Sequence, residues 1–204
     1  GSGNNSTASN SLAYTTSCKV GNCLSLGGGS AYYVNIPLAV TANLSNWSVE
    51  FWVKTTEAGS SEIYWQRPSL YGMSSGGATD KDFGIISNSG TLGLWSGLNT
   101  GGDNSVLSSS TINNNLWRHI AVTSNGSTLR LYLDGTDTTT TLAINQALHA
   151  TQAYYLGTQN YYAGGVAFPH QGLYDEFHFY PRTLTASQIT QNYTKDQHQI
   201  NQKF

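Results

Sequence analysis

Residues 116–135 read LWRHIAVTSNGSTLRLYLDG and carry the clearest β pattern in the chain. The first half contains a continuous apolar stretch that includes Ile120 and Val122. In residues 129–133, leucines alternate with Arg and Tyr, which is the period of a strand with one face toward a core. The Asp-Gly pair that follows favours a tight turn with positive φ. This stretch therefore predicts two β-strands, the second ending in a tight turn.

The same pattern extends in both directions from this stretch. Short apolar or alternating runs are separated by Gly, Asn, Ser and Thr, which favours an antiparallel sandwich of ten or more strands. The only helical pattern covers residues 184–193, with Thr185 as the expected N-cap. The strands are expected at residues 32–36, 48–54, 83–86, 92–95, 117–123, 129–133, 154–157 and 173–180.

The composition limits the class of protein. The 204 residues include 9 Lys and Arg against 11 Asp and Glu, so the chain lacks the positive charge of a nucleic-acid binder. No apolar run approaches the length of a membrane span, and no heptad repeat indicates a coiled coil. We expect one domain at residues 12–195, a flexible leader at 1–11 and a tail at 196–204.

The two cysteines, Cys18 and Cys23, enclose four residues, one of them Gly21. A zinc site normally uses four ligands, and a redox pair normally encloses two residues. A local disulfide is the favoured interpretation, and it would place the chain in an oxidising compartment. The alternative is a pair of reduced cysteines packed as small apolar residues.

Five segments in order resemble laminin-G-like, concanavalin A-like jelly-roll domains. They are residues 20–37, 47–54, 116–135, 172–180 and 184–189. The resemblance implies an all-β fold: a two-sheet antiparallel jelly-roll sandwich with one short C-terminal helix. It implies a secreted or surface-displayed module, such as part of a bacterial adhesin or pilus. It does not fix the function, because this fold serves lectins, adhesion modules and some glycosidases.

Two segments, 64–82 and 159–171, are predicted to be long loops that bind a carbohydrate. Both combine aromatic residues with amide, hydroxyl or carboxylate groups, which suit the apolar faces and hydroxyl edges of sugars. The alternatives are that the aromatics pin their own loops or join the core, and that Arg67 pairs with Asp80 or Asp82. The candidate ligand-binding residues are Trp65, Arg67, Tyr71, Asp80, Asp82, Tyr161, Tyr162, Phe168 and His170.

The resemblance also implies a calcium ion near the rim, with Asp175 as a ligand and the loop 27–30 offering carbonyls. The alternative for Asp175 is a hydrogen bond to a neighbouring loop. Hydrolases of this fold commonly carry a Glu-x-Asp-x-x-Glu strand, which this sequence lacks. Glu50 and Glu176 are the candidate glycosidase pair, because they can meet across adjacent strands. The favoured alternative is that these two acids are solvated or salt-bridged.

We therefore expect a non-catalytic extracellular recognition module that binds a glycan or surface glycoprotein, with possible help from calcium. The module is expected to be monomeric within a larger protein, and it is expected neither to bind nucleic acid nor to sit in a membrane. Alternatives are a protein-binding adhesion module, a structural spacer and, as a minor case, a glycoside hydrolase.

Overall fold

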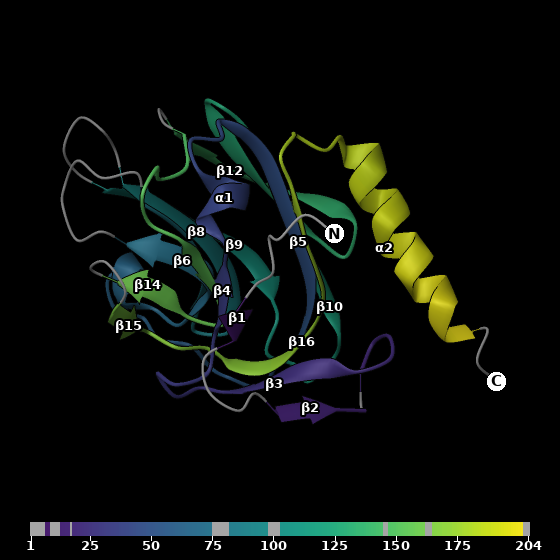
Figure 1. Cartoon of the computed structure of the whole chain (residues 1–204). Coiled ribbons are helices and arrows are strands. Elements are labelled where there is room, and N and C mark those ends of the chain that lie inside the picture. Colours follow the sequence, from purple (N-terminus) through teal and green to yellow (C-terminus); the bar gives the residue numbers. More distant parts are fainter. Residues whose placement is uncertain are drawn as a thin grey trace.

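The computed structural model describes residues 7–8, 13–16, 18–74, 82–97, 103–144, 147–161 and 165–201. They form two mainly antiparallel sheets packed face to face, with one long helix on the outside (Figure 1). In spatial order the nine-stranded sheet contains β1 (Thr7–Ala8), β4 (Val34–Ile36), β13 (Tyr154–Leu156), β6 (Ser69–Ser74), β7 (Phe83–Asn88), β8 (Thr91–Gly97) and β9 (Asp103–Thr111), with β14 (Gln159–Tyr161) paired to β6 and β15 (Gly165–Ala167) paired to β14. The seven-stranded sheet contains β12 (Thr136–Ala143), β11 (Thr128–Leu133), β10 (Arg118–Asn125), β5 (Asn46–Lys54), β16 (Gln171–Tyr180), β3 (Cys23–Gly27) and β2 (Ala13–Thr15).

The stretch 116–135 forms the centre of the seven-stranded sheet. Ile120 of β10 is paired with Leu133 on one side and with Phe51 of β5 on the other, so all three side chains point into the sandwich. Asp134 and Gly135 both have positive φ, 51° and 73°, as a two-residue hairpin turn requires. The predicted strands and turn are confirmed.

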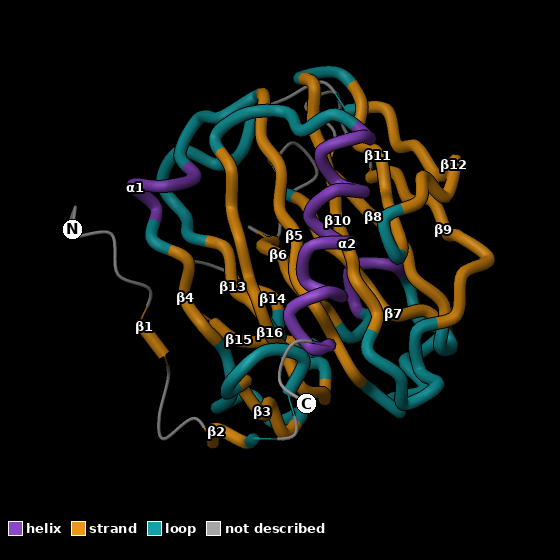
Figure 2. Tube along the Cα trace, turned by 90° about the vertical axis from the view of Figure 1, so that its right-hand side faces the viewer, coloured by secondary structure: helices purple, strands orange, loops and turns teal. Residues whose placement is uncertain are grey.

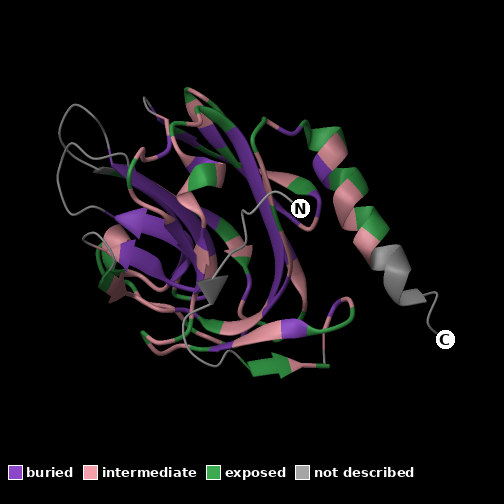
Figure 3. Cartoon of the chain, in the orientation of Figure 1, coloured by how far each residue is buried: buried purple, intermediate pink, exposed green. Residues whose placement is uncertain are grey.

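Buried residues lie on the strands of both sheets (Figure 3). Most of their apolar side chains form one core cluster. Val49, Phe51 and Val53 alternate on β5 and meet apolar residues of β7 and β8 from the opposite sheet. Trp47 is 1% exposed and lies 5.0 Å from Phe83, ring centre to ring centre. Each such side chain contributes about 1.5–3 kcal/mol through burial. Trp117 lies just before β10 and is only half-buried.

Helix α2 (Ala186–Asn201) lies on the outer face of the seven-stranded sheet (Figure 2). It begins with a capping box: Gln188 N–H donates to Thr185 Oγ1 at 3.3 Å, and Thr185 N–H donates to Gln188 Oε1 at 3.0 Å. The predicted N-cap is confirmed, but the helix continues past residue 193. It does so because the Trp52 indole stacks on Tyr193 and donates to Asp196 Oδ2 at 2.9 Å.

The structure corrects several expected boundaries. Part of the expected leader, Thr7–Ala8, forms strand β1, which needs only backbone pairing with β4. Residues 196–201 of the expected tail belong to α2. Two short helical turns were not expected: α1 (Leu38–Thr41) and the 3₁₀ turn η1 (Tyr64–Gln66). None of the helices in the described part of the chain has the length and apolarity needed to cross a membrane.

The segments 64–82 and 159–171 are not simply loops. The first contains β6, a buried inner strand of the nine-stranded sheet, and the second contains β14 and β15. Their glycines and serines hid the strand pattern, because on these strands one face carries almost no large side chains. The structure nevertheless brings the two segments together, since β14 runs parallel to β6 along three residue pairs.

Candidate functional site

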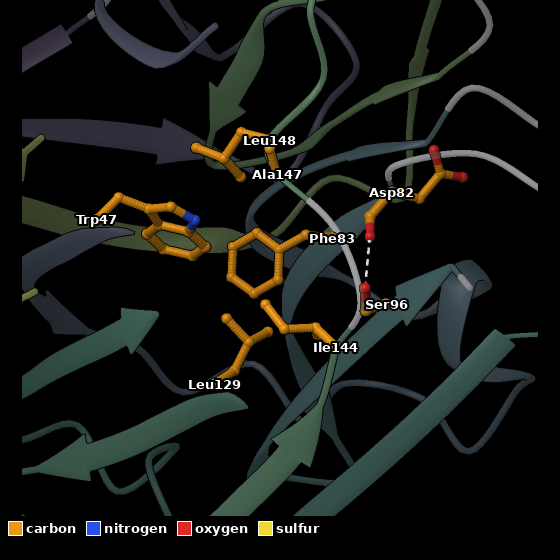
Figure 4. Close-up of a pocket in the computed structure, with 8 residues that line it drawn as sticks. All are labelled: Trp47, Asp82, Phe83, Ser96, Leu129, Ile144, Ala147 and Leu148. Carbon is orange, nitrogen blue, oxygen red and sulfur yellow. Dashed lines mark hydrogen bonds between the residues drawn. The ribbon is translucent and has the colours of Figure 1, made fainter. Parts of the chain in front are cut away.

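One described cavity between the sheets, lined by Trp47, Phe83 and Leu129 among others, holds about 10 Å³ (Figure 4). That is room for at most one water molecule, so this cavity does not admit a sugar. Ser96 Oγ, at one side of the cavity, donates to the backbone oxygen of Asp82 at 2.9 Å.

The outer face of the nine-stranded sheet carries an unusual row of residues. Gln159 is paired with Gly72, Gly72 with Gly84, and Gly84 with Trp95, across β14, β6, β7 and β8. Residues paired directly across strands point to the same side of a sheet. Because the adjacent residues Met73 and Phe83 point into the core, this row faces outward. Two glycines thus separate an amide side chain from an indole.

Trp95 lies flat across the glycine of the next strand. A Cβ atom at Gly84 would be 2.2 Å from Trp95 Nε1, so no residue other than glycine fits beneath this ring. Trp95 is 1% exposed, and its Nε1–H has no hydrogen-bond partner. The Gln159 amide, 0% exposed, has no partner for its oxygen or its nitrogen. Such unpaired buried groups cost free energy, and they commonly mark functional positions.

Aromatic side chains of η1 cover the Trp95 end of this row. Tyr64 lies 6.4 Å from Trp95, ring centre to ring centre, and 5.1 Å from Trp65 in an edge-on arrangement. Tyr64 and Trp65 are both half-buried, so each ring keeps part of its surface in solvent. The predicted candidate Trp65 is therefore a partly exposed surface residue and no member of the main core.

A second aromatic pair lies at the other end. Tyr161 and Phe168 meet edge-on at 5.8 Å, and both are half-buried. Ser69 N–H donates to the backbone oxygen of Phe168 at 2.8 Å, which ties this hairpin to the start of β6, four residues after Trp65. Phe168 has a φ of 57°, a strained value for an aromatic residue. We define the aromatic face as Tyr64, Trp65, Trp95, Gln159, Tyr161 and Phe168.

Three predicted ligand-binding residues are buried and do not reach a surface. Tyr71 is 0% exposed on the inner side of β6, where it stacks with Tyr154 at 5.6 Å. Asp82 is 2% exposed, and its Oδ2 accepts a hydrogen bond from Ser74 Oγ. His170 is 0% exposed, with its Nδ1 bonded to the Tyr174 hydroxyl at 2.6 Å. Burial lowers the pKa of His170 to about 3, so it is neutral at physiological pH.

The remaining predicted residues are placed as follows. Arg67 is half-buried, and its Nε–H donates to the backbone oxygen of Glu62 at 2.6 Å. Burial lowers the pKa of this guanidinium, which stays charged. Asp80 and Tyr162 lie outside the described residues.

The disulfide between Cys18 and Cys23 is present, with the Cα atoms 5.4 Å apart. Asp175 lies beside it, and its carboxylate accepts hydrogen bonds from the backbone N–H groups of Val20, at 2.8 Å, and Glu176, at 2.9 Å. The pKa of Asp175 is raised because burial outweighs these hydrogen bonds. The carboxylate thus fastens the disulfide loop to β16, which is the alternative role considered for it.

The described His, Cys, Asp and Glu side chains that converge on Asp175 are the two cysteines of the disulfide, whose sulfurs are soft and already bonded to each other. Calcium takes six to eight oxygen ligands, so these side chains alone do not make a calcium site. Calcium binding near Asp175, with backbone carbonyls as further ligands, stays a prediction of the resemblance.

Sequence reasoning missed Trp95, Tyr64 and Gln159 as site residues. Trp95 was only placed in an expected strand, and Gln159 lay in a segment from which other residues were chosen as candidates. The available signal was the repeated glycine at Gly72 and Gly84, which marks strands that another group approaches closely.

The geometry defines a class of protein: a two-sheet jelly roll with an apolar core and a partly exposed aromatic surface on one sheet. The family model described as the concanavalin A-like lectin/glucanases superfamily matches residues 27–190. The chain belongs to this superfamily. No curated protein sequence matches it significantly.

Solved structures share the fold. The binding domain of Paraclostridial Mosquitocidal Protein 1 has a TM-score of 0.72 at 16% identity, over 96% of this chain and 48% of that chain. Domain 4 of AbnA, a GH43 extracellular arabinanase from Geobacillus stearothermophilus solved with arabinotriose, has a TM-score of 0.65 at 20% identity, over 91% and 86%. The binding domain of botulinum neurotoxin serotype G has a TM-score of 0.64 at 13% identity, over 95% and 47%. The chain thus spans about half the length of these toxin domains.

Proposed function

We propose that the chain is a non-catalytic, extracellular module that binds glycans through the aromatic face. Half-exposed rings at both ends of the face offer flat apolar surfaces for the C–H faces of sugars. The buried Trp95 indole lies under the Tyr64 end of this face.

The observation that carries this proposal is the placement of two half-buried aromatic pairs at the two ends of one row across the sheet: Tyr64 with Trp65, and Tyr161 with Phe168. Between them, Trp95 and Gln159 lie buried in the row with only glycines between them. Because Trp95 is 1% exposed and Gln159 is 0% exposed, a ligand would contact the half-buried rings and not these two residues.

The comparisons support the same kind of function. Domain 4 of the arabinanase was solved with arabinotriose, and one botulinum neurotoxin binding domain was solved with SialylT. Both toxin structures are of binding domains. The disulfide supports an oxidising, extracellular location.

The one acid pair considered for a glycosidase does not support that activity. Glu50 is 3% exposed beneath α2, where its Oε1 accepts hydrogen bonds from the Tyr180 hydroxyl at 2.6 Å and the Asn192 amide at 2.8 Å. A carboxylate enclosed in this way has no access to a sugar.

The first test is a glycan array on the purified domain, followed by calorimetry with the best hit. Trp65→Ala should weaken binding about tenfold, as expected when an aromatic anchor is truncated. Its matched control is Tyr14→Ala, since Tyr14 is 70% exposed on the other sheet. Tyr161→Ala serves as a second variant if Trp65→Ala fails to fold. A blank array from folded protein, or equal affinities for Trp65→Ala and Tyr14→Ala, contradicts the proposal and favours a protein-binding or spacer role.

A further inference from the structure

A second concave surface lies on the other sheet. An open pocket of about 210 Å³ forms where β3, β5 and β16 meet the loop before β10. Ser25, Leu173 and Lys54 are paired across these three strands, so their side chains share one face. We call this the rim pocket and define it by Ser25, Lys54, Thr56, Asn115, Gln171 and Leu173.

The backbone that forms the rim pocket is held by hydrogen bonds. Thr55 Oγ1–H donates to the backbone oxygen of Gln171 at 2.7 Å, and the backbone N–H of Gln171 donates to Glu57 Oε2. Asn115 N–H donates to the backbone oxygen of Thr55 at 3.0 Å, and Asn115 itself has a φ of 60°. These contacts fix the positions from which the pocket side chains project.

The polar ends of those side chains are free. Within the described part of the chain, the side chains of Ser25, Lys54, Thr56, Asn115 and Gln171 make no hydrogen bond or ion pair. One ammonium group, two amides and two hydroxyls therefore surround a half-buried apolar residue, Leu173. This set offers donors and acceptors on all sides of a small apolar floor.

Lys54 differs from most other described cations. Arg118 is paired with Asp134 at 2.8 Å, and Arg130 with Asp137 at 3.0 Å. The Lys19 ammonium lies 3.9 Å from the centre of the Trp52 ring. Lys54 has neither a carboxylate nor an aromatic ring as a partner, so its charge is available to a ligand.

Tyr32 adds apolar surface beside the pocket. It is 38% exposed, and its ring lies against Gly27, a lining residue: a Cβ at Gly27 would be 3.6 Å from Tyr32 Cε2. A pyranose ring that lay over Leu173 would be close to the edge of the Tyr32 ring.

We propose that the rim pocket binds a sugar residue that bears a carboxylate, of the hexuronic acid class. The Lys54 ammonium pairs with the carboxylate, the amides of Asn115 and Gln171 bond the ring hydroxyls, and Leu173 supports the apolar face of the ring. A single ammonium matches one carboxylate, whereas phosphate sites usually collect several cations or backbone N–H groups. This site is on the other sheet from the aromatic face, and it does not depend on the function proposed there.

The test is an NMR titration of ¹⁵N-labelled protein with glucuronic acid, with glucose as the neutral counterpart and inorganic phosphate as a second anion. Glucuronic acid should shift the amide signals of Asn115, Gln171 and Leu173, with a dissociation constant about fivefold or more below that of either probe. Lys54→Met keeps the aliphatic stem and should weaken glucuronic acid binding about fivefold or more, while Lys195→Met, at an exposed lysine on α2, should not.

Three results would overturn this proposal: no shifts in the rim pocket, equal binding of glucose, or equal binding of phosphate. The spectrum of Lys54→Met shows directly whether that variant is folded, and Gln171→Ala is the second variant. Shifts confined to Tyr161, Phe168 and their neighbours would reject the rim pocket and leave the aromatic face intact. Shifts confined to the rim pocket support this proposal and do not bear on the aromatic face.

Discussion

Individual residues of the aromatic face lower the stability of the folded domain. The Gln159 amide is completely buried and unpartnered, although an apolar residue of similar shape would fill the same space without that cost. A similar cost arises at Gly84. The absence of a side chain there leaves room for the Trp95 indole, whose Nε1–H has no hydrogen-bond partner.

We predict that Gln159→Met raises the free energy of unfolding by about 1 kcal/mol, because it removes an unpaired buried amide and keeps the side-chain volume. Because the amide is 0% exposed, the same variant should keep its glycan affinity. The measurements are urea unfolding and calorimetry. Gln188→Met is the matched control: its amide oxygen caps α2, so it should lose stability and keep glycan affinity. A loss of stability in Gln159→Met would mean that the amide has a structural partner, such as a bound water.

The sequence did not show which of the candidate binding residues would be buried. Trp65, Tyr161 and Phe168 were chosen for their ring chemistry and lie on a surface, whereas Tyr71 and His170 had equally suitable chemistry and lie in the interior. Nothing in residues 64–74 showed that β6 would be an inner strand, because its outward positions are glycine and serine. The side of the sheet depends on pairing with β7 and β14, which local sequence does not encode.

At the scale of elements, α2 is held by polar contacts as much as by apolar ones. Leu184 and Ile189 pack on Ala121 and Tyr132, while Glu50 lies buried beneath the helix. His119 Nε2 lies 3.7 Å from Glu50 Oε2, and His119 Nδ1 has no partner. Burial, and then the charges of His178 and Lys19, lower the pKa of His119 to about 4.

This makes the stability of the α2 contact dependent on pH. Between pH 6.5 and about 4 the unfolded chain binds a proton at His119 that the folded chain does not, so stability falls as pH falls through this window. The loss attributable to His119 is at most about 3 kcal/mol. Glu50 acts in the opposite direction, since burial raises its pKa, and its contribution is lost as pH rises.

We predict that His119→Phe, which keeps a ring against Trp52 and Tyr193, removes the part of this acid sensitivity that is due to His119. Urea unfolding of both proteins at several pH values between 4 and 7 measures it. The difference in unfolding free energy should move in favour of His119→Phe as the pH falls. Parallel curves for the two proteins would show that His119 is protonated equally in the folded and unfolded states.

Elements with strong alternation were predictable, and those without it were not. The runs at β5, β10 and β11 carry their apolar residues every second position, and their predicted ranges agree with the structure within about two residues. The strands β14 and β15 have three residues each and are held by pairing with β6, so their own sequence carries little signal. The second half of α2 depends on Trp52, which is over a hundred residues away in sequence.

At the scale of the whole molecule, the two proposed binding surfaces lie on different sheets. The nine-stranded sheet presents the aromatic face, while the seven-stranded sheet carries the rim pocket. Helix α2 also lies on the seven-stranded sheet (Figure 2). The order of motifs along the chain was enough to predict this two-layer architecture, since it is a property of the superfamily. The position of a binding surface is not such a property, because the same fold carries different sites.

Calcium binding would act on the whole molecule, because an ion that bound the folded state would stabilise the entire domain. Saturation to about 100 times the dissociation constant adds about 2.7 kcal/mol, which is a rise of roughly 5–10 °C in Tm for a domain of this size. Asp175 already accepts two backbone N–H groups and lies against a closed disulfide. We therefore predict that chelation leaves the Tm of the wild-type protein unchanged within about 1 °C. Asp175→Asn should lower the Tm equally with calcium and with chelator, because the disulfide loop loses its charged anchor. If Asp175 were a ligand, chelation would lower the Tm of the wild type and leave that of Asp175→Asn unaffected, and magnesium would not restore it.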